Sequence, residues 1–71
     1  MDKKYEAVVL DDASARVRRM FASDSLDDAE RWFCSSYRDE TGREPSADEM
    51  KYFADGHDVS VGSLTWRLRR R

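Results

Sequence analysis

The 71-residue chain has few of the residues on which special architectures depend: one cysteine, one histidine, one proline and three glycines. The single cysteine, Cys34, excludes an internal disulfide and is typical of a reducing compartment, so we expect a cytoplasmic protein. The longest apolar run, residues 7–10, is far shorter than the roughly 20 residues that span a bilayer. The first residues lack the apolar segment of a signal peptide.

Thiol and imidazole side chains, which serve in zinc binding and nucleophilic catalysis, are equally scarce. Cys34, His57 and Asp58 are the best candidates, but zinc normally takes three or four ligands, and no spacing joins this cysteine to this histidine. A Cys–His pair would also need a third group to orient it. The glycines are isolated, which excludes a glycine-rich phosphate loop. We therefore expect no metal, no cofactor and no enzymatic activity.

The charges that are present are unevenly distributed along the chain. Residues 22–58 carry eleven acidic and four basic side chains, whereas residues 59–71 carry four arginines and no acid. The whole chain has a net charge of −2. Because the acidic stretch has helical periodicity and its flanks have strand periodicity, we expect acidic helices and a basic sheet. At 71 residues this is one domain, residues 1–71, with residues 69–71 expected as a mobile basic tail.

Residues 5–10 (YEAVVL) and 15–21 (ARVRRMF) predict two strands joined by a turn at residues 11–14. A four-residue loop there would place Leu10 opposite Ala15, Val8 opposite Val17 and Glu6 opposite Arg19. Loops of three or five residues fit almost as well. The four-residue register would leave Arg16 and Arg18 on the other face of the sheet.

Two helices are predicted in the middle of the chain. Ser25 with Asp28, and Ser46 with Glu49, have the spacing of capping boxes. Gly42 is a natural end for the first helix, and the second should end at Gly56. The inner stripes predicted from helical spacing are Leu26, Ala29, Trp32, Phe33, Ser36 and Tyr37, then Met50, Phe53 and Ala54.

Residues 58–70 (DVSVGSLTWRLRR) alternate strongly, and the alternation changes phase between Val61 and Leu64. A two-residue turn at Gly62 and Ser63 explains the change and pairs Val61 with Leu64 and Val59 with Trp66. One long strand with a bulge at Gly62 is the alternative. The expected fold is α+β, a three- to four-stranded antiparallel sheet with two helices on one face, in the order ββααββ or ββααβ. Its expected core comprises Val8, Leu10, Val17, Leu26, Ala29, Trp32, Phe33, Tyr37, Met50, Phe53, Val61, Leu64 and Trp66.

Two surfaces are candidates for function. The first is the acidic face of the second helix, where Tyr52 is expected among Asp48, Glu49 and Asp55. Tyrosine is a frequent anchor in protein interfaces, so an exposed tyrosine among carboxylates is a candidate hot spot. The carboxylates would steer the chain to a basic surface. In size and charge the chain compares with phage and mobile-element inhibitors of nucleic-acid-handling proteins, anti-CRISPR proteins among them. A solvated helix face without function is the competing interpretation.

The second surface is a basic sheet face formed by Arg16, Arg18, Arg67 and Arg69, which predicts contacts with nucleic-acid phosphates. An isoelectric point near 5.3 argues against it, since nucleic-acid-binding domains usually lie above about 9. A further explanation is that these charged side chains only keep an open sheet soluble and prevent pairing at its edges. A third hypothesis is self-association, in which the basic face of one copy binds the acidic helices of another. We therefore expect a monomer or a homodimer.

Overall fold

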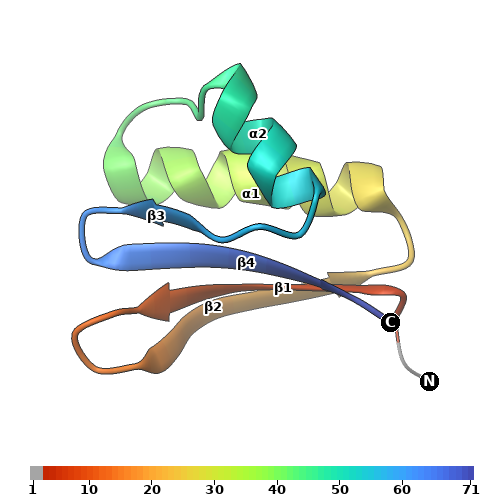
Figure 1. The fold of residues 1–71 in the computed structure, drawn as a ribbon, viewed down its shortest axis with the longest axis horizontal. Helices are drawn as coiled ribbons and strands as arrows, with labels where there is room; N and C mark the ends of the chain where they lie inside the picture. Colours follow the sequence, from red (N-terminus) through yellow and green to blue (C-terminus); the bar gives the residue numbers. More distant parts are fainter. Residues whose placement is uncertain (1–2) are drawn as a thin grey trace.

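A computed structural model describes residues 3–71 and confirms the order ββααββ; residues 1 and 2 of the expected domain lie outside the described part. The elements are β1 (Tyr5–Asp11), β2 (Arg16–Ser23), α1 (Leu26–Thr41), α2 (Ala47–Ala54), β3 (Val59–Val61) and β4 (Leu64–Arg70). The four strands form one antiparallel sheet in the order β2-β1-β4-β3. Both helices cover the same face of that sheet, which leaves its other face open (Figure 1).

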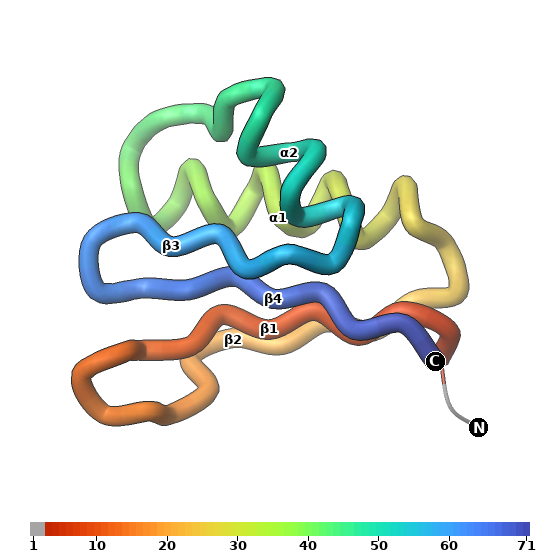
Figure 2. The backbone as a smooth tube through the Cα atoms, viewed as in Figure 1, coloured from red at the N-terminus to blue at the C-terminus, as the bar shows by residue number. Residues whose placement is uncertain are grey.

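The two hairpins lie side by side, with their turns at the same end of the sheet (Figure 2). The backbone N–H of Asp12 in the first turn donates a 2.8 Å hydrogen bond to the carbonyl of Ser63 in the second. In the second hairpin Val59 pairs with Trp66 and Val61 with Leu64, as expected from a turn at Gly62. Gly62 has a φ of 60°, a conformation that favours glycine.

The first hairpin differs from the expected register. Val8 pairs with Met20 and not with Val17, because the loop lies one residue further along the chain and β2 contains a β-bulge. Val9 pairs with Arg19 and Leu10 with Val17, so Arg18 is the extra residue. A bulge of this kind turns two consecutive side chains towards the same face.

The core lies between the helices and the covered face of the sheet. Its largest fully buried side chains are Trp66, Tyr37, Phe33 and Phe53. The predicted core is confirmed for the inner stripe of α1 and for Trp66, but it is wrong for Val17, which is 53% exposed. The alternation of β1 places Ala7 and Val9 under the helices, whereas Val8 and Leu10 lie on the open face. The buried hydrophobic residues that were not predicted are Ala7, Val9, Val59 and Leu68.

Local capping signals set the helix ends. The Ser25 hydroxyl accepts the Asp28 N–H, but the Asp28 carboxylate accepts from Ser23 Oγ, so only half of the first predicted capping box forms. The second, between Ser46 and Glu49, is complete. Gly42 ends α1 with a φ of 76°, as predicted, whereas α2 stops at Ala54, two residues before Gly56.

The C-terminal arginines belong to the sheet. Glu6 pairs with Arg69 and Tyr5 with Arg70, and the backbone N–H of Arg71 donates a 2.8 Å hydrogen bond to the carbonyl of Lys4. Within the basic tail expected at residues 69–71, Arg69 and Arg70 are therefore the end of β4, and Arg71 follows the strand.

Candidate protein-binding face

Helix α2 is fixed at both ends, which determines the face it presents. Its Phe53 ring is fully buried and stacks on Phe33 with ring centroids 4.3 Å apart. The guanidinium of Arg70 donates to the carbonyl of Ala54 and ties the end of the helix to β4. With Phe53 pointing into the core, the residues on the opposite side of α2 must point to solvent.

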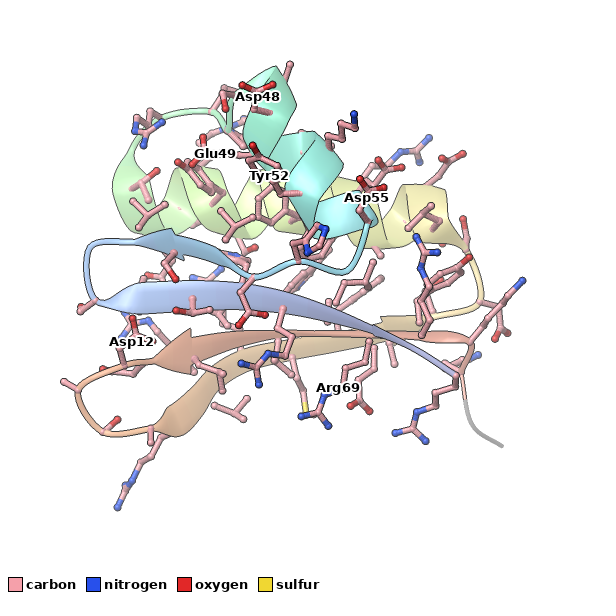
Figure 3. The ribbon with its side chains drawn as sticks, viewed as in Figure 1. Asp12, Asp48, Glu49, Tyr52, Asp55 and Arg69 are labelled. Carbon is pink, nitrogen blue, oxygen red and sulfur yellow. The ribbon has the colours of Figure 1, made fainter. Side chains whose placement is uncertain are left out.

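Asp48, Tyr52 and Asp55 form this outer side, which we call the α2 face (Figure 3). Tyr52 is 52% exposed and is one of three exposed large hydrophobic residues in the described chain. Its ring lies edge-on to His57 with centroids 6.4 Å apart, which limits its motion. Asp48 and Asp55 are exposed and form no ion pair with another described side chain.

Lys51 also belongs to the outer side of α2, although it was not predicted as part of this surface. It follows Asp48 by three residues and precedes Asp55 by four, so helical geometry places it between the two carboxylates. With Lys51 included, the net charge of the α2 face is therefore about −1.

Glu49 does not belong to the exposed α2 face, although it was predicted there. Its Oε2 atom accepts a 2.6 Å hydrogen bond from the Tyr37 hydroxyl, and its Oε1 atom accepts the Ser46 N–H at 2.9 Å. The Arg43 guanidinium lies 3.7 Å from the same Oε1. Burial alone would raise the pKa of Glu49, but these hydrogen bonds and the Arg43 charge hold that pKa below its usual value. Glu49 thus braces α2 against α1.

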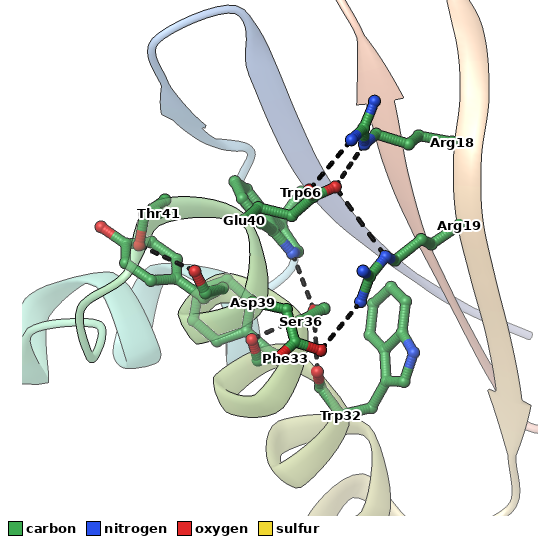
Figure 4. Close-up of polar contacts among 10 residues, drawn as sticks. Arg18, Arg19, Trp32, Phe33, Ser36, Asp39, Glu40, Thr41 and Trp66 are labelled. Atoms are coloured by element: carbon green, nitrogen blue, oxygen red, sulfur yellow. Dashed lines mark hydrogen bonds and ion pairs between the residues drawn. The ribbon is translucent and has the colours of Figure 1, made fainter.

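The four arginines predicted to form a basic sheet face are separated in the structure. Arg18, displaced by the bulge, forms an ion pair with Glu40 of α1, while its neighbour Arg19 lies 3.2 Å from Asp39 (Figure 4). Arg16 pairs with Asp11 and so shares the covered side of the sheet with Val9. The arginines are separated because the bulge directs Arg18 and Arg19 towards Glu40 and Asp39, near the C-terminal end of α1.

Arg67 and Arg69 remain on the open face, but Arg67 is already paired. Two of its guanidinium nitrogens bind the Asp58 carboxylate at 2.9 and 3.0 Å. These hydrogen bonds lower the pKa of Asp58, so the pair stays charged at neutral pH. Arg69 alone cannot provide a phosphate-binding surface of the expected size.

The candidate catalytic residues make separate contacts. Cys34 Sγ lies 3.4 Å from Met50 Sδ, and burial raises the pKa of its thiol, which disfavours the reactive thiolate. His57 packs on Tyr52 instead. Within residues 3–71 no group of three or more His, Cys, Asp and Glu side chains could hold a metal ion.

Two surface features were missed from the sequence. The open face of the sheet carries Val17 and Met20, which are 53% and 63% exposed. An open groove of about 490 Å³ lies between α1 and Met50 of α2. The alternation of β2 indicates which of its side chains share a face, but the bulge changes the phase of that alternation and so hid the exposed pair on the open face. The groove depends on how the two helices pack.

Neither helix in the described part of the chain has both the length and the hydrophobicity needed to cross a membrane. Comparisons of the chain with protein-family models, with curated proteins and with solved structures find no match in any of the three.

Proposed function

We propose that the chain is a non-enzymatic binding module that docks on a basic surface of another cytoplasmic protein through the α2 face. The observation that carries this proposal is the half-exposed Tyr52 ring on the same side of α2 as Asp48 and Asp55 (Figure 3), two carboxylates that have no ion-pair partner among the described residues. A tyrosine buries a large area with few rotatable bonds, which makes it an effective anchor.

The carboxylates would contribute mainly to the rate and specificity of association. Charges at the rim of an interface steer the two proteins together and make the association rate depend on salt. Glu49 supports this arrangement from inside, because its bonds to Tyr37 and Ser46 fix the first turn of α2. The face would therefore be preorganised before a partner arrives.

The partner class we propose is a nucleic-acid-handling protein, whose phosphate-binding groove supplies a basic surface. Occupying that groove would block its substrate, which is how a small phage or mobile-element inhibitor of the anti-CRISPR kind acts. Size and charge support this assignment. Direct binding of nucleic acid by the chain is less favoured, because Arg18 and Arg67 are already paired with Glu40 and Asp58.

The test compares two variants that change the charge equally in the first turn of a helix. Asp48→Lys alters the α2 face, whereas Asp28→Lys alters α1, far from it in the chain. Proteins captured by the immobilised wild-type chain should be retained by Asp28→Lys and lost by both Asp48→Lys and Tyr52→Ala. For a purified partner, Tyr52→Ala should weaken binding by about 2 kcal/mol or more, and Asp48→Lys should slow association by about tenfold.

Two outcomes would overturn this function. Equal capture by Asp48→Lys and Asp28→Lys would show that the α2 face is not used. Micromolar binding of short labelled DNA or RNA by the chain itself, weakening steeply with salt, would favour the nucleic-acid hypothesis instead.

A further inference from the structure

The outer side of α1 carries an open groove that the proposed function does not use. The groove has a volume of about 490 Å³ and is lined by α1 side chains, including Asp27, Glu30, Arg31, Cys34 and Arg38, and by Met50 of α2. Cys34 and Met50 form a sulfur-rich strip, with the two sulfur atoms 3.4 Å apart. The rim is charged, and its charges are ordered along the helix.

The order of these charges is self-complementary. Asp27, Arg31, Cys34 and Arg38 follow one another at intervals of four, three and four residues, so they lie on one stripe of α1. This spacing is the same when it is read in the reverse direction. A second α1 laid antiparallel on the first would therefore bring Asp27 opposite Arg38 of the partner copy, twice per pair, at points roughly 16 Å apart along the helix.

We propose that a second copy of the chain covers this groove, with the two α1 helices antiparallel about a two-fold axis. The same symmetry places Arg31 opposite the small side chain of Cys34 of the partner copy, near the two-fold axis. The axes of packed helices are usually about 8–10 Å apart. Each copy would present its surface to the same surface of the other, as a two-fold dimer requires. Asp27 forms no ion pair with a described side chain.

Arg38 already has one partner and can take a second. Its guanidinium lies 2.6 Å from Glu44, and its side chain is 62% exposed. A guanidinium has five N–H donors in a planar fork, so contact with Glu44 leaves donors for Asp27 of the second copy. Both ion pairs would be near solvent, which makes the expected dimer weak and sensitive to salt.

The inference goes beyond the proposed function and does not rest on it. The α2 face lies outside the groove, so a dimer would carry two such faces and could engage a partner bivalently. Asp48→Lys and Tyr52→Ala should therefore leave dimerisation unchanged. Failure of one proposal would not imply failure of the other.

Sedimentation equilibrium at low salt, from roughly 10 μM to 1 mM, tests the dimer in the concentration range expected of a small polar interface. The average mass should rise with concentration towards twice that of the chain. Asp27→Arg and Arg38→Asp should each weaken dimerisation by about tenfold or more, because each replaces attraction by repulsion at both ends. The double variant Asp27→Arg/Arg38→Asp should restore it to within about threefold, since the charges again alternate.

Asp28→Arg is the matched control, because it makes the same charge change one residue away and outside the groove lining. If a charge reversal perturbs folding, the neutral variants Asp27→Asn and Arg38→Gln replace the reversed ones. A monomeric mass at every concentration, a dimer indifferent to the single reversals, or a double variant that fails to recover would each overturn the proposal.

Discussion

Ser36 accepts the indole N–H of Trp66 at 3.0 Å, and this bond joins the middle of α1 to the central part of β4 inside the core. Both residues are almost completely buried. The Ser36 hydroxyl in turn donates to the carbonyl of Trp32 at 2.7 Å. A small polar residue on the inner stripe of a helix thus satisfies the only polar atom of the largest core side chain.

Replacing this serine tests the bond directly. Ser36→Ala should lower the free energy of unfolding by about 1–3 kcal/mol, because the buried indole N–H loses its acceptor. Urea denaturation measures the change. Ser35→Ala, at an exposed neighbouring position, should cost far less. Equal effects of the two changes would mean that the bond contributes nothing.

Removing the Trp66 ring should be more damaging. The ring is fully buried against Tyr37 and Phe33, with centroids 5.2 and 6.0 Å away, so Trp66→Ala should cost roughly 3–5 kcal/mol. That is a large part of the stability of a domain this small. Trp32→Ala, at a half-buried position, should cost less. A thermal transition unchanged by Trp66→Ala would contradict the core described here.

The Glu49 brace predicts a dependence of stability on pH. The pKa of Glu49 is lowered in the folded chain, so its contribution is complete above the unfolded value, near 4.5, and is lost as pH falls through the folded pKa. Glu49→Gln should therefore be less stable than the wild type at pH 7 and should lose less stability between neutral and acidic pH. Urea denaturation at a series of pH values measures both effects.

Asp48→Asn provides the comparison for this pH series, because it removes an exposed carboxylate from the same turn of α2. Tyr37→Phe should lower stability at neutral pH by about 1.5–3 kcal/mol, the usual contribution of a hydrogen bond to a charged group. If Glu49→Gln keeps the full acid sensitivity of the wild type, the brace does not operate as described.

The turn at Gly62 predicts a difference between two substitutions. A Cβ atom there would meet no other atom within 4 Å, so any cost comes from the backbone φ of 60° alone. Gly62→Val should cost about 1–2 kcal/mol, whereas Gly62→Asn should cost less, because asparagine tolerates the left-handed conformation. Thermal unfolding of both variants checks this order. A valine variant as stable as the asparagine variant would show that the turn relaxes to another conformation.

The local sequence determined the existence of both helices, the caps at Ser46 and Gly42 and the second hairpin. The capping box of Ser46 and Glu49 and the helix end at Gly42 involve backbone groups only a few residues away. Such patterns can therefore be recognised in the sequence. The phase change around Gly62 likewise favoured a turn over the alternative of a bulge. These features depend on short-range sterics and hydrogen bonds.

Tertiary structure alone decided which side of β1 lies in the core and where several charged side chains point. Residues 7–10 are all apolar, and Val8 is buried even on the open face, so alternation could not select a side. The bulge at Arg18 appears only when β2 meets β1, with α1 offering Glu40 and Asp39 to the two displaced arginines. Glu49 lies away from the predicted binding face for a similar reason. The Tyr37 hydroxyl on α1 stabilises the charge of Glu49 better than a position among exposed carboxylates would.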